Sequence, residues 1–283
     1  GTKSESEKFA GALYTTAMES IMPDGKALQM GTSHNLGQHF AKVFYVKFIG
    51  EDKQDHYVWQ TSWGITRRLI GAMIMVHGDD KGLVMPPKVA PTQVVIVPIP
   101  FKGLEADAIA EKTKQIAETL KTKGISVILD DRQEYTPGWK FHQWELKGIP
   151  IRIELGPRDI KAGQVVMVRR DTGQKTPVIE AEILATVEKL LQDIQDNLLA
   201  KAKAILADKT TSVQSYDEFK QVLEAKGGFI KAAWCGSPEC EVKIKDETGA
   251  TIRIRPFQTE KPATSCVVCN EEAPETAYWA RSY

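Results

Sequence analysis

The stretch from residue 92 to residue 207 alternates short apolar runs with amphipathic segments, and this alternation constrains the fold more than any other feature of the chain. The apolar runs, which we predict to be strands, are Val94–Val97, Ser126–Leu129, Ile149–Leu155 and Val165–Val168. Helices are predicted between them, over about Ala106–Lys123 and Lys140–Lys147. Strands that alternate with helices are typical of an α/β domain with a mostly parallel, mixed sheet.

Proline residues mark the start of this domain, and a long helix marks its end. Pro86, Pro87 and Pro91 interrupt the preceding pattern. After a turn at Asp171–Gly173, a helix is predicted over Val178–Ala207. The chain has 283 residues, which is longer than one usual hydrophobic core requires. We therefore predict three domains, over residues 1–91, 92–200 and 201–283.

The first of these domains is predicted to mix strands with helices. A helix is expected over Leu36–Val43, and strands over Tyr45–Ile49 and Tyr57–Trp63. Directly after Gly64 the apolar residues recur with the spacing of a helix that buries one face. The residues that carry this spacing are Ile65, Leu69, Ala72, Met73 and Val76.

The start of that amphipathic helix has the properties of an anion site. Gly64 lets a ligand approach the backbone closely, and the first amides of a helix point outward toward a bound phosphate. Arg67 and Arg68 lie in the first turn, where the helix dipole disfavours a cation by roughly a few tenths of a kcal/mol unless an anion is near. The alternative is that both arginines belong to a solvated helix face.

Charge and hydropathy limit the classes of partner. The 37 lysines and arginines balance 37 acidic residues, so any contact with nucleic acid must come from a local basic patch. No apolar run reaches the ~20 residues that span a bilayer, and no signal peptide is recognisable. We therefore expect a cytoplasmic protein without a membrane partner. The chain begins at Gly1 without an initiator methionine, and we expect it to be part of a longer protein.

All four cysteines lie in the last predicted domain. Cys235 and Cys240 are separated by four residues, and Cys266 and Cys269 by two. Between the pairs, Val242–Ile244 and Ile252–Ile254 alternate about Asp246–Gly249, which predicts a hairpin. In a cytoplasmic chain, four thiolates predict one tetrahedral structural zinc site that stabilises a domain with a thin core. Two disulfides or four unligated thiols are the alternatives.

The helix before these cysteines has a clear start and end. Ser215 and Glu218 form a potential capping box for a helix over Tyr216–Ala225. Gly227 and Gly228 follow the predicted helix and provide a stop signal.

Three segments resemble class II prolyl-tRNA synthetases. They are TSWGITRRLIGAMIMVHGDDKGLVMPP (Thr61–Pro87), KFAGALYTT (Lys8–Thr16) and ALQMGTSHNLGQHF (Ala27–Phe40). They occur in the order of that family, and the similarity continues to Tyr283 in the form that carries a C-terminal extension domain. The resemblance implies the end of an antiparallel catalytic sheet over 1–91, an anticodon-binding α/β domain over 92–200 and a small α+β zinc domain over 201–283. The two earlier class II motifs of the family, including an arginine for the α-phosphate of ATP, lie upstream.

The resemblance also assigns roles near the predicted anion site. It implies that ATP is held by Gln29, Thr66 and Arg68, and that proline is held by Phe9, Thr32, His34, Trp63 and Gly64. From the residues alone, His34 would be a packing or hydrogen-bonding histidine. A pocket for a small ring depends on shape and dry surface more than on acid–base groups.

The segment Gly138–Asp159 combines aromatic, cationic and acidic residues, as in sites for unpaired bases. The carboxylate of Glu145 suits the N1–H and N2–H₂ donors of guanine, and Arg152 suits its O6 and N7 acceptors. Proline anticodons carry two guanines. The alternative is that Trp139, Phe141 and Trp144 fill a core, which we favour for Trp144. The resemblance implies anticodon contacts at Phe141, Glu145, Arg152, Arg158 and Asp159, and a terminal Tyr283 that folds back toward the active site.

The family's function is ATP-dependent activation of proline and its transfer to tRNA(Pro). The resemblance implies proline, ATP with Mg²⁺, and tRNA(Pro) as ligands, a structural zinc ion, and a homodimer in the full-length enzyme. DNA is not expected as a partner. Because half of the ATP and proline site lies upstream in the family, we expect the chain alone not to form prolyl-adenylate. A non-catalytic anticodon-binding or regulatory module is the alternative, and KFAGALYTT and GTSHNLGQ favour proline over threonine, glycine or histidine.

Overall fold

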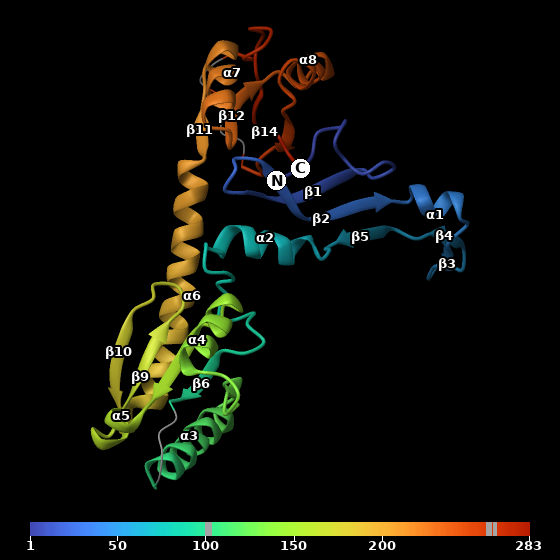
Figure 1. Ribbon diagram of the computed structural model, residues 1–283. Coiled ribbons are helices and arrows are strands. Elements are labelled where there is room, and N and C mark those ends of the chain that lie inside the picture. The colour runs from blue at the N-terminus through green and yellow to red at the C-terminus, as the bar shows by residue number, and fades with distance from the viewer. Residues whose placement is uncertain (100–103, 259–261, 263–264) are drawn as a thin grey trace. The chain divides into compact units, whose positions relative to one another are not determined.

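The computed structural model describes residues 1–99, 104–258, 262 and 265–283 (Figure 1). The chain forms two compact units, one made of Gly1–Ala72 with Ala204–Tyr283 and the other of Met73–Lys203. The divisions fall inside helices α2 (Arg68–His77) and α6 (Ile183–Asp208). No helix in the described part of the chain is both long enough and apolar enough to cross a lipid bilayer.

The N-terminal part of the first unit is a three-stranded antiparallel sheet in the order β1–β2–β5. Its strands are β1 (Tyr14–Ile21), β2 (Ala27–Gly37) and β5 (Gln60–Gly64). Between β2 and β5 lie α1 (His39–Val43) and a two-stranded ribbon of β3 (Lys47–Ile49) and β4 (Asp55–Tyr57).

Two sequence predictions in this region need correction. The predicted helix over Leu36–Val43 starts at His39, because β2 extends as far as Gly37 and pairs there with β5. The predicted strand over Tyr57–Trp63 is divided between β4 and β5, and Val58 and Trp59 lie between the two strands.

The C-terminal part of the first unit is a four-stranded sheet in the order β11–β12–β14–β13, with two helices. The elements are β11 (Thr210–Ser212), α7 (Tyr216–Ala225), β12 (Phe229–Trp234), α8 (Pro238–Thr248), β13 (Thr251–Ile254) and β14 (Glu275–Ala280). The capping box at α7 is confirmed in its main contact, since the Ser215 hydroxyl accepts a hydrogen bond from the amide of Glu218. Trp279 and Phe219 are fully buried and pack edge to face at the centre of this part.

The hairpin predicted about Asp246–Gly249 is wrong. The first of its two strands is part of α8, and Ile252 in β13 pairs with Trp279 in β14. The Ser237 hydroxyl caps α8 by accepting from the amide of Cys240, and Gly249 ends the helix in the left-handed conformation with φ 72°. Three alternating residues are too few to distinguish the two-residue period of a strand from the 3.6-residue period of a helix. The caps at Ser237 and Gly249 therefore decide that this segment is helical.

The second unit is a five-stranded sheet in the order β10–β9–β8–β6–β7. Its strands are β6 (Val94–Pro98), β7 (Val127–Leu129), β8 (Ile151–Leu155), β9 (Gln164–Arg169) and β10 (Lys175–Ile179). β6 runs parallel to β7 and β8, whereas β9 is antiparallel to β8 and β10. The sheet is mixed as predicted, but it is less parallel than expected, because the turn at Asp171–Gly173 joins β9 to β10 in a hairpin. The long helix therefore begins later than Val178, at Ile183 after the short 3-10 helix η1 (Glu180–Glu182).

Helices cover both faces of this sheet (Figure 1). They are α3 (Leu104–Thr122), α4 (Pro137–Leu146), the short α5 (Pro157–Lys161) and the first part of α6. Val94 and Ile96 point toward α3 and α6, whereas Val95 and Val97 point toward Trp144 on α4. These four residues of β6 are fully buried, because side chains alternate between faces and both faces are covered.

A buried carboxylate joins the end of β7 to α4. The carboxylate of Asp130 accepts hydrogen bonds from the indole of Trp144 at 2.7 Å and from Arg132 at 2.8 Å. The ammonium of Lys140, itself buried, donates to the backbone oxygen of Asp130. Burial raises the pKa of Asp130, but these donors and the charge of Lys140 outweigh burial and lower the pKa to about 2.

We predict that protonation of the Asp130 carboxylate lowers the unfolding free energy in acid. Its folded-state pKa lies below the unfolded value near 4, so its contribution is present above pH 4 and disappears as the pH falls through about 2. Between pH 5 and pH 3, wild type should lose about 1 kcal/mol more unfolding free energy than the Asp130→Asn variant. Urea unfolding of the Met73–Lys203 unit, followed by hydrogen exchange, measures this difference. Equal losses in the two proteins would contradict it.

Candidate functional site

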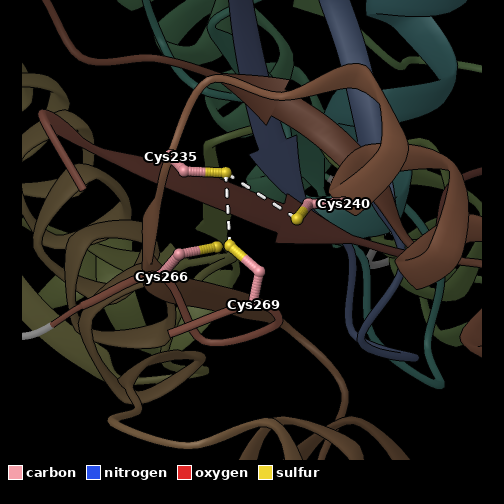
Figure 2. A group of neighbouring side chains, drawn as sticks. All are labelled: Cys235, Cys240, Cys266 and Cys269. Atoms are coloured by element: carbon pink, nitrogen blue, oxygen red, sulfur yellow. Dashed lines mark hydrogen bonds between the residues drawn. The ribbon is translucent and has the colours of Figure 1, made fainter. Parts of the chain in front are cut away.

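The four cysteines converge in the first unit (Figure 2). Their sulfur atoms all lie within 4.8 Å of one another. The Cys235 sulfur is 3.7 Å from both the Cys240 and the Cys269 sulfurs, well beyond the ~2.05 Å of a disulfide bond. Four sulfurs at about 2.3 Å from a tetrahedral zinc ion would be separated by about 3.8 Å. The cluster therefore has the donor set and the spacing to hold a metal ion.

Local structure explains how each cysteine reaches the cluster. Cys235 directly follows β12, and the cap at Ser237 begins α8 so that Cys240 lies in its first turn. Cys266 and Cys269 lie in a tight loop, where Asn270 adopts φ 62° and its amide donates to the oxygen of Cys266. The spacing alone predicts that the four thiols converge, and the fold confirms this prediction.

The electrostatic environment differs between the thiols. Burial opposes ionisation of Cys266, but the backbone amides of Cys269, Val268 and Cys235 donate toward its sulfur and lower its pKa to about 7. Burial raises the pKa of Cys240. Amide donors that favour a thiolate are common around metal-binding cysteines.

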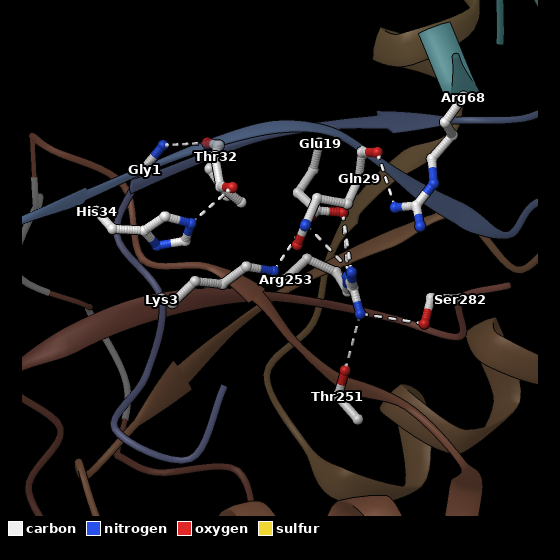
Figure 3. A network of polar contacts seen from close by, with 11 residues as sticks. Gly1, Lys3, Glu19, Gln29, Thr32, His34, Arg68, Thr251, Arg253 and Ser282 are labelled. Carbon is white, nitrogen blue, oxygen red and sulfur yellow. Dashed lines mark hydrogen bonds and ion pairs between the residues drawn. The ribbon is translucent and has the colours of Figure 1, made fainter. Parts of the chain in front are cut away.

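A second constellation surrounds His34 on the N-terminal sheet (Figure 3). The His34 ring hydrogen-bonds to the Thr15 hydroxyl at 2.9 Å through Nδ1 and to the Thr32 hydroxyl at 3.0 Å through Nε2. The Phe9 ring lies 4.7 Å from the His34 ring. Because both ring nitrogens are engaged and His34 is buried, the residue is suited to shaping a pocket wall rather than to transferring protons.

Strand register brings Gly64 to this constellation but turns Trp63 away from it. Gly64 lies opposite Thr32, and a Cβ at Gly64 would be 3.0 Å from the Thr32 hydroxyl. Trp63 lies opposite Ser33, on the other face of the sheet, and is 80% exposed. Because successive strand residues alternate between faces, the structure gathers Phe9, Thr32, His34 and Gly64 but not the Trp63 side chain.

The predicted nucleotide residues also meet. Arg68 is the first residue of α2, and its guanidinium donates to the backbone oxygen of Gln29 at 3.2 Å (Figure 3). The Thr66 hydroxyl accepts from the amide of Arg68. Among the described residues no carboxylate forms an ion pair with Arg68, and the residue is exposed.

A buried ion network lies beside this group, and sequence reasoning missed it. The Glu19 carboxylate accepts from Lys3 at 2.7 Å and from Arg253 at 3.1 Å (Figure 3). The side chains of Lys3, Glu19 and Arg253 are 2%, 1% and 8% exposed. Burial lowers the pKa of Lys3, although Glu19 opposes this. Glu19 pairs with Gln29 in the sheet, and Arg253 is 234 residues away in the sequence, so no local pattern could reveal the network.

The C-terminal residue lies along the start of β2. Ser282 bridges to Ala27, and the Tyr283 amide donates to the oxygen of Ala27 at 3.4 Å. The Lys26 ammonium lies 5.1 Å from the centre of the Tyr283 ring, which is 59% exposed.

In the second unit, three of the predicted RNA contacts come together. A cavity of about 160 Å³ is lined by Glu145, Arg152 and further cations. The Arg152 guanidinium lies over the Phe141 ring at 4.4 Å and also pairs with Glu154 at 2.9 Å. The other cations that line the cavity are Lys81, Arg169, Arg170 and Lys175. Sequence reasoning missed these four, because they come from other segments of the chain.

The turn after α2 supplies part of this cavity. Lys81 pairs with Glu145 at 3.3 Å, and Asp79 accepts two hydrogen bonds from Arg170 at 2.6 and 2.8 Å. The turn approaches α4 so closely that a Cβ at Gly82 would be 2.5 Å from the backbone oxygen of Leu146. Gly82 also has φ 127°, so glycine is required at this contact.

The remaining predicted RNA residues lie elsewhere. Arg158 and Asp159 are in α5 and do not line the cavity, and the Asp159 carboxylate accepts from the amide of Gly156 at 2.9 Å. Trp144 is buried and donates to Asp130, which confirms its assignment to the core.

Comparison with known proteins matches both units to one group of enzymes. The family model "Anticodon binding domain" matches residues 93–190, and "Prolyl-tRNA synthetase, C-terminal" matches residues 216–283. The chain is 53% identical to a proline–tRNA ligase of Natranaerobius thermophilus, 50% to one of Alkaliphilus oremlandii and 52% to one of Cenarchaeum symbiosum. Each comparison covers 100% of this chain but only 58% or 59% of the relative. The whole chain therefore belongs to the prolyl-tRNA synthetase family, and it spans little more than half the length of these relatives.

Proposed function

We propose that the chain provides the RNA-reading and metal-stabilised parts of an ATP-dependent proline–tRNA ligase, together with part of its amino-acid-activating site. The observation that carries this proposal is the cavity lined by Glu145 and Arg152 within the matched anticodon-binding region, where the Arg152 guanidinium packs on the Phe141 ring. The proposed division is a catalytic part over residues 1–91, an anticodon-binding domain over 92–200 and a zinc domain over 201–283. The proposed location is the cytoplasm, and the longer protein is proposed to be a homodimer.

The cavity has the chemistry to bind a guanine. The Glu145 carboxylate offers acceptors for N1–H and N2–H₂, and Arg152 offers donors for O6 and N7. One face of the Arg152 guanidinium packs on the Phe141 ring, so its other face can stack on a base. Five cations and one acid line the cavity, and these cations outnumber the carboxylates with which they pair, so a net positive charge remains for the phosphates of a single strand. Arg158 and Asp159, on α5, are proposed as outer contacts of the same RNA.

The N-terminal sheet is proposed to hold part of the proline and ATP site. In the reaction, the proline carboxylate attacks the α-phosphate of ATP and pyrophosphate leaves. The terminal ribose hydroxyl of tRNA(Pro) then takes the prolyl group, and AMP leaves. Phe9, Thr32, His34 and Gly64 would shape the proline pocket, with the Trp63 backbone at its edge. Arg68, held by Gln29 and Thr66, would neutralise charge on ATP, and Mg²⁺ bound with ATP would supply further charge neutralisation.

The cysteine cluster and the last residue are also proposed to support that site. The four cysteines Cys235, Cys240, Cys266 and Cys269 would hold a structural zinc ion with no open coordination position. Tyr283, which lies beside Ala27, would close the same end of β2 that carries Gln29.

The proposal is tested with the Glu145→Gln variant and anticodon stem–loop RNAs. A glutamine places amide hydrogens toward the guanine donors, so affinity for a loop with two anticodon guanines should fall about 5- to 150-fold, equivalent to about 1–3 kcal/mol. Affinity for a loop with adenines in their place should change little. Fluorescence anisotropy of labelled RNA measures both. The exposed Glu188→Gln variant is the matched control, and a wild-type chain that does not prefer the guanine loop would contradict the proposal.

A further inference from the structure

A second aromatic surface lies at the start of α4 and in the segment before it, outside the Glu145 cavity. The rings of Tyr135 and Trp139 are stacked, with centroids 3.8 Å apart and an angle of 10° between planes. The Arg132 guanidinium lies 4.8 Å from the centre of the Tyr135 ring and 5.4 Å from that of Trp139. Tyr135 covers one face of the indole, yet Trp139 remains 42% exposed. The core does not need this pair, because Trp144 fills the space between α4 and the sheet.

The Arg132–Tyr135–Trp139 stack is held in place before any ligand binds. Arg132 donates to both oxygens of the buried Asp130 carboxylate at 2.8 Å and to the Gln143 side chain at 2.6 Å. The amide of Trp139 donates to the Thr136 hydroxyl that caps α4. A rigid aromatic surface loses little conformational entropy when a ligand stacks on it.

A cavity adjoins the stack at the position where open α/β sheets bind ligands. β6 is followed by α3 on one face, and its neighbour β7 is followed by α4 on the other face. Ligands in such folds bind outside the carboxyl ends of the two strands where the connections diverge. The cavity at these ends has a volume of about 210 Å³, and the described residues that line it include Pro98, Thr113, Lys114, Leu129, Arg132 and Gln133. Arg132 belongs to both the cavity and the stack.

This surface is distinct from the Glu145 cavity. Residues two apart in a helix with 3.6 residues per turn point about 200° apart, so Trp139 and Phe141 lie on opposite flanks of α4. Gln143 continues the Trp139 flank, and Glu145 continues the Phe141 flank. No residue lines both cavities in the described part of the chain.

We propose that the Arg132–Tyr135–Trp139 stack binds an unpaired nucleobase of the same RNA whose guanines enter the Glu145 cavity; this rests on the proposed RNA-binding function. The base stacks on the free face of the Trp139 indole. Lys114, which lines the adjoining cavity together with Arg132, supplies a cation for the neighbouring phosphate. Because the two surfaces are separated only by the width of one helix, the stacked base lies within a few nucleotides of the guanines. Stacking uses the π face that every base has, so this contact tolerates any base.

The test compares Trp139→Leu with Trp139→Phe in the full chain. Trp139→Leu should weaken binding of an anticodon stem–loop RNA about 5- to 150-fold, the equivalent of about 1–3 kcal/mol for one stacked base, and Trp139→Phe should restore most of the affinity. The guanine and adenine loops should weaken by the same factor, unlike the selective loss in Glu145→Gln. Trp59→Leu, at a 69% exposed tryptophan in the other unit, is the matched control.

A set of RNAs with one abasic site at each unpaired loop position identifies the stacked base. At one position the abasic RNA should bind wild type and Trp139→Leu equally, because neither complex then has the stack. Unchanged RNA affinity in Trp139→Leu, while Glu145→Gln still loses guanine preference, would overturn the stacking site and leave the proposed function intact. A Trp139→Leu loss that persists with every abasic RNA would show a structural role and also overturn it. Failure of wild type to bind any loop would instead refute the proposed function, and the stacking site with it.

Discussion

Replacing Cys266 with serine is expected to unfold the metal-binding region of this protein. The described residues around the cysteine cluster form a small sheet with two helices, and a bound metal would cross-link β12, α8 and the loop before β14. Apparent binding free energies of structural zinc sites are about 10–16 kcal/mol, which is comparable to or larger than the whole stability of a domain, about 5–15 kcal/mol. Loss of one ligand therefore removes enough free energy to melt this region.

The measurement combines metal content with unfolding. Wild type should carry one zinc ion per chain, and a strong chelator should lower its thermal midpoint and expose its four thiols to a thiol reagent. Cys266→Ser should retain no zinc at stoichiometric concentration and should show the lowered midpoint without chelator. Glu271→Gln, an exposed change in the same loop, should behave as wild type. A wild-type chain that folds equally well with and without chelator would refute the structural role of a metal.

Replacing Arg253 with methionine is expected to destabilise the first unit by about 3–5 kcal/mol. The Arg253 side chain is 8% exposed and donates to Glu19, which is 1% exposed, so the variant leaves a buried carboxylate with only Lys3 as its partner. A buried ion pair stabilises little by itself, but removing one partner leaves the desolvation penalty of the other uncompensated. The contact joins β1 to β13, and its loss should also loosen the C-terminal segment that Arg253 holds through Ser282.

The matched control for this variant is two residues away. Arg255→Met breaks the ion pair with Glu275, but the Arg255 side chain is 33% exposed, and the expected loss is at most about 1 kcal/mol. Urea unfolding, with hydrogen exchange to assign the loss to the first unit, measures both variants. The triple change Lys3→Met, Glu19→Leu and Arg253→Met should recover much of the stability, because it leaves no unpaired buried charge. Equal effects of Arg253→Met and Arg255→Met would refute the special role of the buried network.

Local signals in the sequence predicted the elements whose ends are marked by caps or turns. The helix over Tyr216–Ala225 begins and ends as its Ser215 cap and its following glycines predict. The sequence predicted β6 because it is apolar at every position, as both of its faces are covered, but it missed β10, part of which was assigned to the long helix. The predicted hairpin about Asp246–Gly249 failed because a helix cap three residues before Cys240 outweighs a short alternation.

The candidate sites likewise include parts that local sequence signals predict and parts that only tertiary packing decides. Spacing alone was enough to predict that the four cysteines gather, because a loop and a helix start can bring two close pairs to one point. Register, in contrast, is a property of paired strands, so the sequence could not show that Trp63 faces away from His34. Nor could it show that Lys81 and Arg170 join Glu145 in one cavity.

By itself, the sequence determined the capped helix over Tyr216–Ala225, the apolar strand β6, the metal-binding pattern and the family, because each depends on residues that are close along the chain or on matched segments in order. Tertiary structure alone decided which side chains share a face, a cavity or a buried charge. The Glu19–Arg253 contact, between residues 234 apart, and the flank of α4 on which Trp139 lies are the examples with the largest consequences. Such contacts depend on strand pairing and helix rotation, which are set by packing of the whole unit and not by any single segment.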